Sequence, residues 1–322
     1  MPKFITIGEP LVVMASQDVD VSLDEAVHFK KYLAGAEFNV ALGIKRLGHS
    51  AGYVSKVGAD TFGRFITEAA QEAELDTQNL IYDENFLTGV YLKQCVSMGD
   101  PVTSYFRKNS AASNLKIDEI DLSTLADVQI AHLSGIFPAL SPRTLQTFRA
   151  FNDKLQENKV FTVFDPNLRP ALWKNQKEMV DTLNNLAKNS QIVLPGINEV
   201  QILMGSSQPE KIADFYLSQS SLTESVVVKL GAEGAFVKTK AGATYTVSGF
   251  KVDKVVDTVG AGDGFAVGLE SALLEGKTLE VAVHRACAIG ALAVQSAGDS
   301  EGYPTRQELM DFYKSQNYQG DL

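Results

Sequence analysis

Short apolar runs and helix-like segments alternate along most of this 322-residue sequence, and this alternation restricts its fold more than any other feature. Residues 4–8 form a β-rich run that ends at glycine, and residues 36–47 then have the pattern of a helix. Residues 51–57 are a second strand candidate, and apolar residues recur at helical spacing from Phe62 to Ala73. Strands separated by helices pair in parallel, so the sequence predicts an α/β fold with a doubly wound, mostly parallel sheet flanked by helices.

Two segments, at about residues 10–33 and 88–108, interrupt this alternation. The second contains two β-rich runs around a turn at residues 99–101, which is the pattern of a β-hairpin. Strands inserted between βα units cannot all join the parallel sheet, so we expect them to form a small β-sheet lid over the active site. We expect residues 1–322 to form a single domain. Further strand candidates of the main sheet lie at residues 130–133, 160–164, 192–194 and 226–228.

The composition argues against several classes of partner. The net charge is −10 and no block of Lys or Arg stands out, so we expect no nucleic acid. No apolar run approaches the roughly 18 residues that a membrane span requires, so we expect no membrane partner and a cytoplasmic location. The two cysteines are too few for a disulfide framework, and the four histidines lack the spacing of a zinc site.

A glycine-rich turn stands directly before the apolar helical run at residues 265–274. It reads Asp257-Thr258-Val259-Gly260-Ala261-Gly262-Asp263. Backbone N–H groups at the start of a helix attract phosphate, and a carboxylate in the first turn can accept a proton from an attacking hydroxyl. The alternative is that Asp263 only caps the helix, because aspartate is favoured in the first turn of any helix.

A second segment, near the N-terminus, favours the functional interpretation of that turn over the helix cap. It reads Ala34-Gly35-Ala36-Glu37-Phe38-Asn39-Val40-Ala41, with Gly48 and Gly58 downstream, and it resembles the N-terminal signature of the ribokinase-like (PfkB) carbohydrate kinases. Residues 257–263, with Gly268, resemble the C-terminal signature of that family. The resemblance implies a ribokinase-like fold and in-line transfer of the γ-phosphoryl group of ATP to a sugar hydroxyl. It also implies that Asp263 is the base and that the amides of Gly260, Ala261 and Gly262 stabilise the developing charge.

The resemblance further implies where ATP and Mg²⁺ bind. Lys229, Gly231 and Gly234 follow a strand and resemble the family's loop beside the nucleotide. Asn167, Gly260 and Gly262 are expected at the phosphates, and Ala291 and Ser296 border the adenine by position. The family often has Asn, two residues and Glu after a strand, whereas Asn198 here is followed by Gln201 where that Glu would fall. We therefore expect Asn198 near the phosphates and assign no protein ligand to Mg²⁺.

Residues 105–113 and 165–173 resemble those members of the family that phosphorylate 2-keto-3-deoxygluconate to its 6-phosphate. Such a sugar acid carries a carboxylate, whose geometry suits the paired donors of Arg107 and Arg169. The resemblance also implies that substrate contacts come from Gly35, Ala36, Asn39, Tyr91, Tyr105 and Asp299.

Three alternatives stay open. In the first, Arg107 is an exposed lid charge. In the second, Arg169 faces the ATP phosphates, as similar stretches occur in related fructokinases, so fructose or another ketose is the second substrate candidate. The third alternative is a sugar-binding sensor without catalysis. A dehydrogenase is disfavoured because Gly8-Glu9-Pro10 stands where a Gly-x-Gly-x-x-Gly turn would be expected. The open edges of the lid sheet favour a homo-oligomer that pairs through it.

Overall fold

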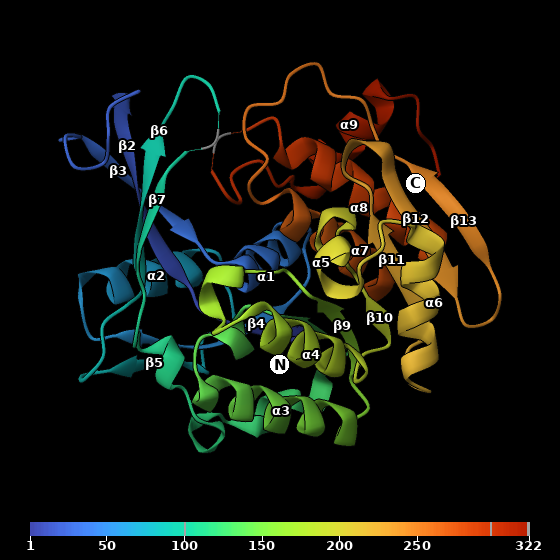
Figure 1. Cartoon of the computed structure of the whole chain (residues 1–322), viewed down its shortest axis with the longest axis horizontal. Helices are drawn as coiled ribbons and strands as arrows, with labels where there is room; N and C mark the ends of the chain where they lie inside the picture. Colours follow the sequence, from blue (N-terminus) through green and yellow to red (C-terminus); the bar gives the residue numbers. More distant parts are fainter. Residues whose placement is uncertain (100, 297, 321–322) are drawn as a thin grey trace.

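A nine-stranded sheet forms the centre of the protein in the computed structural model, which describes residues 1–99, 101–296 and 298–320 (Figure 1). The strand order is β13-β12-β11-β10-β9-β8-β1-β4-β5, and the neighbours from β11 to β5 pair in parallel. β12 and β13 extend the sheet in antiparallel fashion. The bounds are β1 (Phe4–Ile7), β4 (Ala51–Gly58), β5 (Leu80–Asp83), β8 (Ile130–Ser134), β9 (Phe161–Asp165), β10 (Ile192–Val193), β11 (Ser225–Lys229), β12 (Gly234–Thr239) and β13 (Thr244–Ser248). The predicted mostly parallel sheet is confirmed.

Helices cover both faces of this sheet, as the alternation predicts. Alternate strand residues enter opposite cores: Phe4 and Ile130 pack with one set of helices, whereas Ile5 and Ala131 pack with the other. The first set is α1 (Ala36–Arg46), α2 (Thr61–Glu72), α7 (Ala261–Leu274), α8 (Leu279–Ala293) and α9 (Arg306–Ser315). The second set is α3 (Pro142–Glu157), α4 (Gln176–Ala187), α5 (Ile197–Met204) and α6 (Pro209–Gln219). Short 3₁₀ turns are η1 (Ala112–Asn114), η2 (Ile117–Glu119), η3 (Leu122–Asp127), η4 (Phe137–Ala139), η5 (Pro170–Leu172) and η6 (Gly231–Glu233).

Four strands form a separate, smaller sheet, which we call the small sheet. Its order is β3 (Phe29–Ala34), β2 (Leu11–Val19), β6 (Val90–Cys95) and β7 (Thr103–Phe106). β2 and β6 pair in parallel, and the two outer pairs are antiparallel. Figure 1 shows it at one side of the molecule, next to α2. The two inserted segments therefore form one small sheet, as predicted.

Neither cysteine forms a disulfide: Cys95 and Cys287 are both free. Across the described ranges, no helix combines the length and the apolar character that a membrane crossing needs.

Candidate active site

A cavity of about 360 Å³ opens between the small sheet and the ends of the main strands. Glu9, Asp165 and Lys229 stand at the carboxyl ends of β1, β9 and β11, which is where ligands bind in open α/β sheets. Predicted residues on its wall are Gly35, Ala36, Asn39, Tyr91, Tyr105, Arg107, Asn167, Arg169, Lys229, Gly260, Gly262, Asp263 and Asp299. We call this space the substrate cavity.

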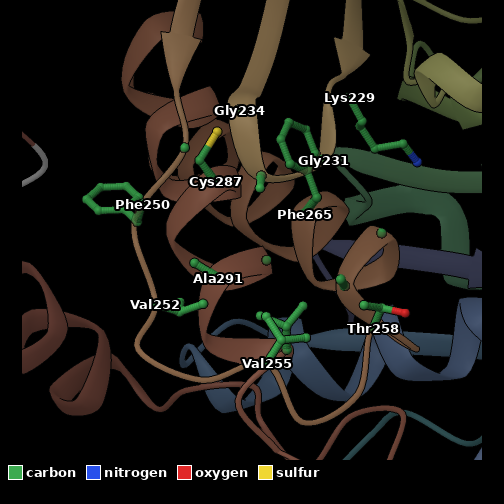
Figure 2. A pocket seen from close by; sticks show the side chains of 16 residues that line it. Lys229, Gly231, Gly234, Phe250, Val252, Val255, Thr258, Phe265, Cys287 and Ala291 are labelled. Carbon is green, nitrogen blue, oxygen red and sulfur yellow. The ribbon is translucent and has the colours of Figure 1, made fainter. Parts of the chain in front are cut away.

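A second cavity, of about 310 Å³, adjoins the first and has an apolar wall. Figure 2 shows Phe250, Val252, Val255 and Ala291 on one side of it, with Lys229 and Thr258 across from them. The predicted residues Gly231, Gly234, Ala261 and Gly262 also line it. Lys229, Thr258 and Gly262 border both cavities, so the two spaces meet at the start of α7. We call it the apolar cavity.

The turn before α7 requires glycine at position 260, the N-cap of the helix. Gly260 has φ 79°, and a Cβ there would overlap the carbonyl oxygen of Asp299. Gly262 is open by contrast, because an added Cβ would meet only the amino group of Lys229, at 3.7 Å. The backbone of this helix start is therefore accessible from the cavities, and its free N–H groups can hold an anion.

Asp263 lies in the first turn of α7 and faces Asn39 from the first turn of α1. The Asn39 side chain donates to the Asp263 carboxylate over 3.0 Å. Burial raises the pKa of Asp263, and the hydrogen bond from Asn39 and the charges of Arg169 and His132 act against that rise. Asp263 is thus the carboxylate at which a proton can be received.

Gly35 places Asn39 in this arrangement. Its φ is 119°, and a Cβ there would lie 2.6 Å from the carbonyl oxygen of Glu9, so only glycine fits the turn that starts α1. Asn39 is almost completely buried, and its amide oxygen has no hydrogen-bond partner among the described residues. A buried acceptor of this kind requires a donor, which a sugar hydroxyl can supply.

The partly buried Lys229 and the buried Asp165 form an ion pair of 2.5 Å where the two cavities meet. Burial alone would lower the pKa of Lys229, but the carboxylates of Asp165 and Glu199 raise it above its usual range. Asn167 adopts the left-handed conformation, with φ 38°, and its N–H donates to Asp165 over 3.1 Å. This arrangement keeps a cation, Lys229, at the start of α7.

One predicted nucleotide contact is not where the sequence placed it. Asn198 is exposed and lies outside both cavities, whereas Glu199 lines the substrate cavity. Glu199 is turned inward because its carboxylate accepts the N–H groups of Gly196 and Leu168, each over 2.8 Å. The three-residue spacing from Gly196 to Glu199 matches the family's Asn-x-x-Glu pattern, with glycine in place of asparagine. This spacing is the sequence signal that identifies Glu199. Ser296, unlike Ala291, also lies outside the apolar cavity.

Arg107 does not enter the substrate cavity as an isolated cation. Its Nε donates to Glu9 over 2.6 Å, and the hydroxyl of Ser110 donates to the other oxygen of the buried Glu9 carboxylate. The rings of Tyr91 and Tyr105 stack at 5.0 Å, and the Arg107 guanidinium lies 5.8 Å from the centre of Tyr105. The role of Glu9 has no local signal in the sequence, because 98 residues separate it from Arg107.

Arg169 and Asp299 complete the wall of the substrate cavity. Arg169 is exposed, donates to the carbonyl of Leu168 over 2.9 Å, and forms no ion pair within the described residues. Burial and the nearby Asp263 carboxylate raise the pKa of Asp299 to about 7. The cavity therefore contains one arginine paired with a carboxylate and one that is available to an anion.

Comparison with known proteins places the chain in a family. Residues 1–306 match the pfkB family carbohydrate kinases. The chain is 44% identical to 2-dehydro-3-deoxygluconokinase of Bacillus subtilis (strain 168), over 97% of this chain and 95% of that protein. A PfkB protein from Polaromonas sp. JS666 superimposes with a TM-score of 0.87 at 40% identity, over 97% of this chain and 99% of that one. A protein provisionally named ribokinase II from E. coli, in complex with ATP and Mg²⁺, has a TM-score of 0.89 at 26% identity, over 98% and 100% of the two chains. This chain is a member of the pfkB family of carbohydrate kinases.

Proposed function

We propose that this protein is a 2-keto-3-deoxygluconate kinase, which transfers the γ-phosphoryl group of ATP to the 6-hydroxyl of that sugar acid. The observation that carries the proposal is the substrate cavity, whose wall includes Asp263 and Asn39 as well as Arg107 and Arg169. A sugar acid has a hydroxyl that can bind Asp263 and Asn39, and a carboxylate that can bind the arginine side of the cavity. The 44% identity to 2-dehydro-3-deoxygluconokinase, another name for a kinase of this substrate, supports the same choice.

The apolar cavity suits the adenine of ATP. It is lined by Val252, Val255 and Ala291, and it ends at the glycine turn before α7 (Figure 2). A base in this cavity directs its phosphates to the N–H groups at the start of α7, of which that of Ala261 donates weakly to the carbonyl of Thr258 over 3.4 Å, and to Lys229. The phosphates of ATP would thus lie next to Asp263.

Magnesium fits the same junction through a small number of protein oxygens. In the described part of the chain, no three His, Cys, Asp or Glu side chains cluster as a ready-made metal cage. Glu199 lines the substrate cavity together with Lys229 and Gly262, which border both cavities. Mg²⁺ is commonly held by one or two carboxylates together with phosphate oxygens and water, so Glu199 is the residue that would hold it. When bound, the ion neutralises charge on the phosphate oxygens.

The residues of this chain divide the reaction between them. Asn39 holds the Asp263 carboxylate by one amide atom and offers its free oxygen to the sugar. Asp263 accepts the proton of the attacking hydroxyl as the new O–P bond forms and the bond to the β-phosphate oxygen breaks. The N–H groups of residues 260–262 stabilise the charge on the transferred group.

Substrate discrimination comes from the arginine side of the cavity. Arg169 has no carboxylate partner among the described residues, so a substrate carboxylate can pair with it directly. Arg107 keeps its place through Glu9 and presents its remaining N–H groups. A neutral ketose leaves Arg169 without an anion, whereas Arg107 keeps Glu9 in either case, and we expect the kcat/KM of the ketose to be on the order of 10- to 100-fold lower.

A coupled assay of ADP formation tests this function. Equal concentrations of 2-keto-3-deoxygluconate and fructose are compared with ATP and Mg²⁺. A clear preference for the sugar acid supports the proposal, and a preference for fructose would assign a ketose kinase instead. Absence of ADP formation with every sugar would leave a binding protein without catalysis.

We also propose that two copies pair through the small sheet in the cytoplasm. Its edge strand β7 exposes Tyr105, Phe106 and the preceding Val102, with Phe106 62% exposed. An unpaired apolar edge favours pairing with another copy. Among the described residues, the small sheet has only a minor buried cluster of its own, Leu11, Val13, Ala34 and Tyr91, while Val12 of β2 packs in the core of the main sheet, which supports a single-domain chain. Light scattering of the wild type and of Phe106→Lys tests the pairing.

A further inference from the structure

A buried ion pair lies outside both cavities, and the reaction described above does not use it. Nδ1 of His132 and Oε1 of Glu270 are 2.7 Å apart, and neither side chain is more than 2% exposed. Removing two charges from water costs several kcal/mol per ion, so a buried pair contributes little net stability. The position of this pair therefore calls for another explanation.

The pair lies behind the catalytic groups because of the elements that carry it. Glu270 follows Asp263 by seven residues on α7, which is about two helical turns, so both project from the same face. His132 precedes Ser134 by two residues on β8, so these two also share a face. The Ser134 hydroxyl donates to Glu37, which lines the substrate cavity. α7 thus carries Asp263 at the cavity and Glu270 in the buried pair, and β8 carries His132 in the pair and Ser134, which contacts the cavity wall only through Glu37.

His132 is faced by carboxylates from three packed elements. Glu270 and Asp263 face it from α7, Asp165 from β9, and Glu37 from α1. Burial alone would lower the pKa of His132, but these carboxylates, with Glu270 foremost, raise it to about 8. The imidazole therefore keeps its positive charge to a higher pH than a free histidine, and that charge opposes the rise that burial causes in the pKa of Glu270.

We propose that His132, held as an imidazolium by Glu270, is a positioning residue that keeps Asp263 ionised and ready to accept the proton of the sugar hydroxyl. Asp263 needs this support because burial and the neighbouring Asp165 both favour its protonated form. The positive charge of His132 acts in the opposite direction from beneath the site. This inference rests on the proposed kinase function, in which Asp263 is the base.

The pH dependence of kcat/KM for 2-keto-3-deoxygluconate tests the inference. In His132→Gln we expect the acidic limb to move upward by about one pH unit, which lowers kcat/KM about tenfold on that limb. Glu270→Gln should move the limb in the same direction, because His132 then loses the carboxylate that keeps it charged. His49→Gln is the matched control, since His49 pairs with Glu275 at the other end of α7, and its limb should not move.

An unchanged acidic limb in a folded His132→Gln protein would overturn the inference. Nitrogen NMR of the imidazoles in the wild type gives a second test that needs no substrate and no folded His132 variant. The other three histidines are assigned from single variants, so the remaining signal is that of His132. We expect an imidazolium at pH 7, and a neutral ring there would also overturn the inference. If the wild type makes no ADP with any sugar, the kinase function fails, and the NMR result still stands by itself.

Discussion

The side-chain amide of Asn39 donates a hydrogen bond of 3.0 Å to the carboxylate of Asp263, although 224 residues separate them in the chain. Each residue lies in the first turn of a helix, and Gly35 and Gly260, which both have positive φ, precede those helices. The two glycine turns therefore build one site from both ends of the sequence. In the proposed reaction, the Asp263 carboxylate is held by this hydrogen bond from Asn39.

Asn39→Ala should lower kcat about tenfold and raise KM, because it removes one charge-assisted hydrogen bond and one acceptor for the sugar. The measurement is steady-state kinetics with the sugar acid. Asn152→Ala is the matched control: its amide is also buried, donates to the carbonyl of Asn189, and is not part of either cavity. The control should lose stability and keep its kcat. Wild-type kinetics in Asn39→Ala would contradict the role of the amide.

Arg169→Ala should raise KM for 2-keto-3-deoxygluconate at least tenfold and change KM for fructose much less, because only the acid offers a carboxylate. The side chain is exposed, so we expect little change in the melting temperature. Kinetics with both sugars measure the effect. Equal increases for both substrates would show that Arg169 does not bind the carboxylate.

Arg107→Ala should also raise KM for the acid more than for the neutral sugar, but with a loss of stability. It leaves the buried Glu9 carboxylate without its cation, which typically costs about 3 kcal/mol. Urea unfolding measures that cost, and adding Glu9→Gln should recover most of it. A double variant as unstable as Arg107→Ala alone would contradict the pairing.

Asp299→Asn should stabilise the protein at pH 8 and have little effect at pH 4. The pKa of Asp299 is raised to about 7, so the folded protein holds this proton more tightly than the unfolded chain, and stability is lost as the pH rises from about 4 through 7. Asparagine removes that loss. Melting temperatures of both proteins at the two pH values measure it, and an equal difference at pH 4 and pH 8 would argue against a raised pKa.

Much of the fold and the site could be predicted from local patterns. The helix predicted at residues 265–274 lies within α7, and the strand predicted at residues 130–133 lies within β8, because periodicity and turn residues act within a few positions. The antiparallel strands β12 and β13 were missed: Gly234 was interpreted only as part of a nucleotide loop, although it also starts β12.

The missed site residues have a different cause, which is long-range contact. Glu9 meets Arg107, and His132 meets Glu270 across 138 residues, so neither pair has a local signal. Asn198 and Glu199 differ by one helical position, and the capping bonds of Glu199 decide which of them faces the cavity. Such choices depend on packing between distant segments, and periodicity does not contain them.

We propose that Asp263 is the base of a sugar-acid kinase. The most direct test is the turnover of Asp263→Asn with ATP, Mg²⁺ and 2-keto-3-deoxygluconate, measured together with sugar binding by calorimetry. We expect a folded protein that still binds the sugar acid and whose kcat is lower by on the order of 10²-fold or more. A folded variant with near wild-type kcat would contradict the claim.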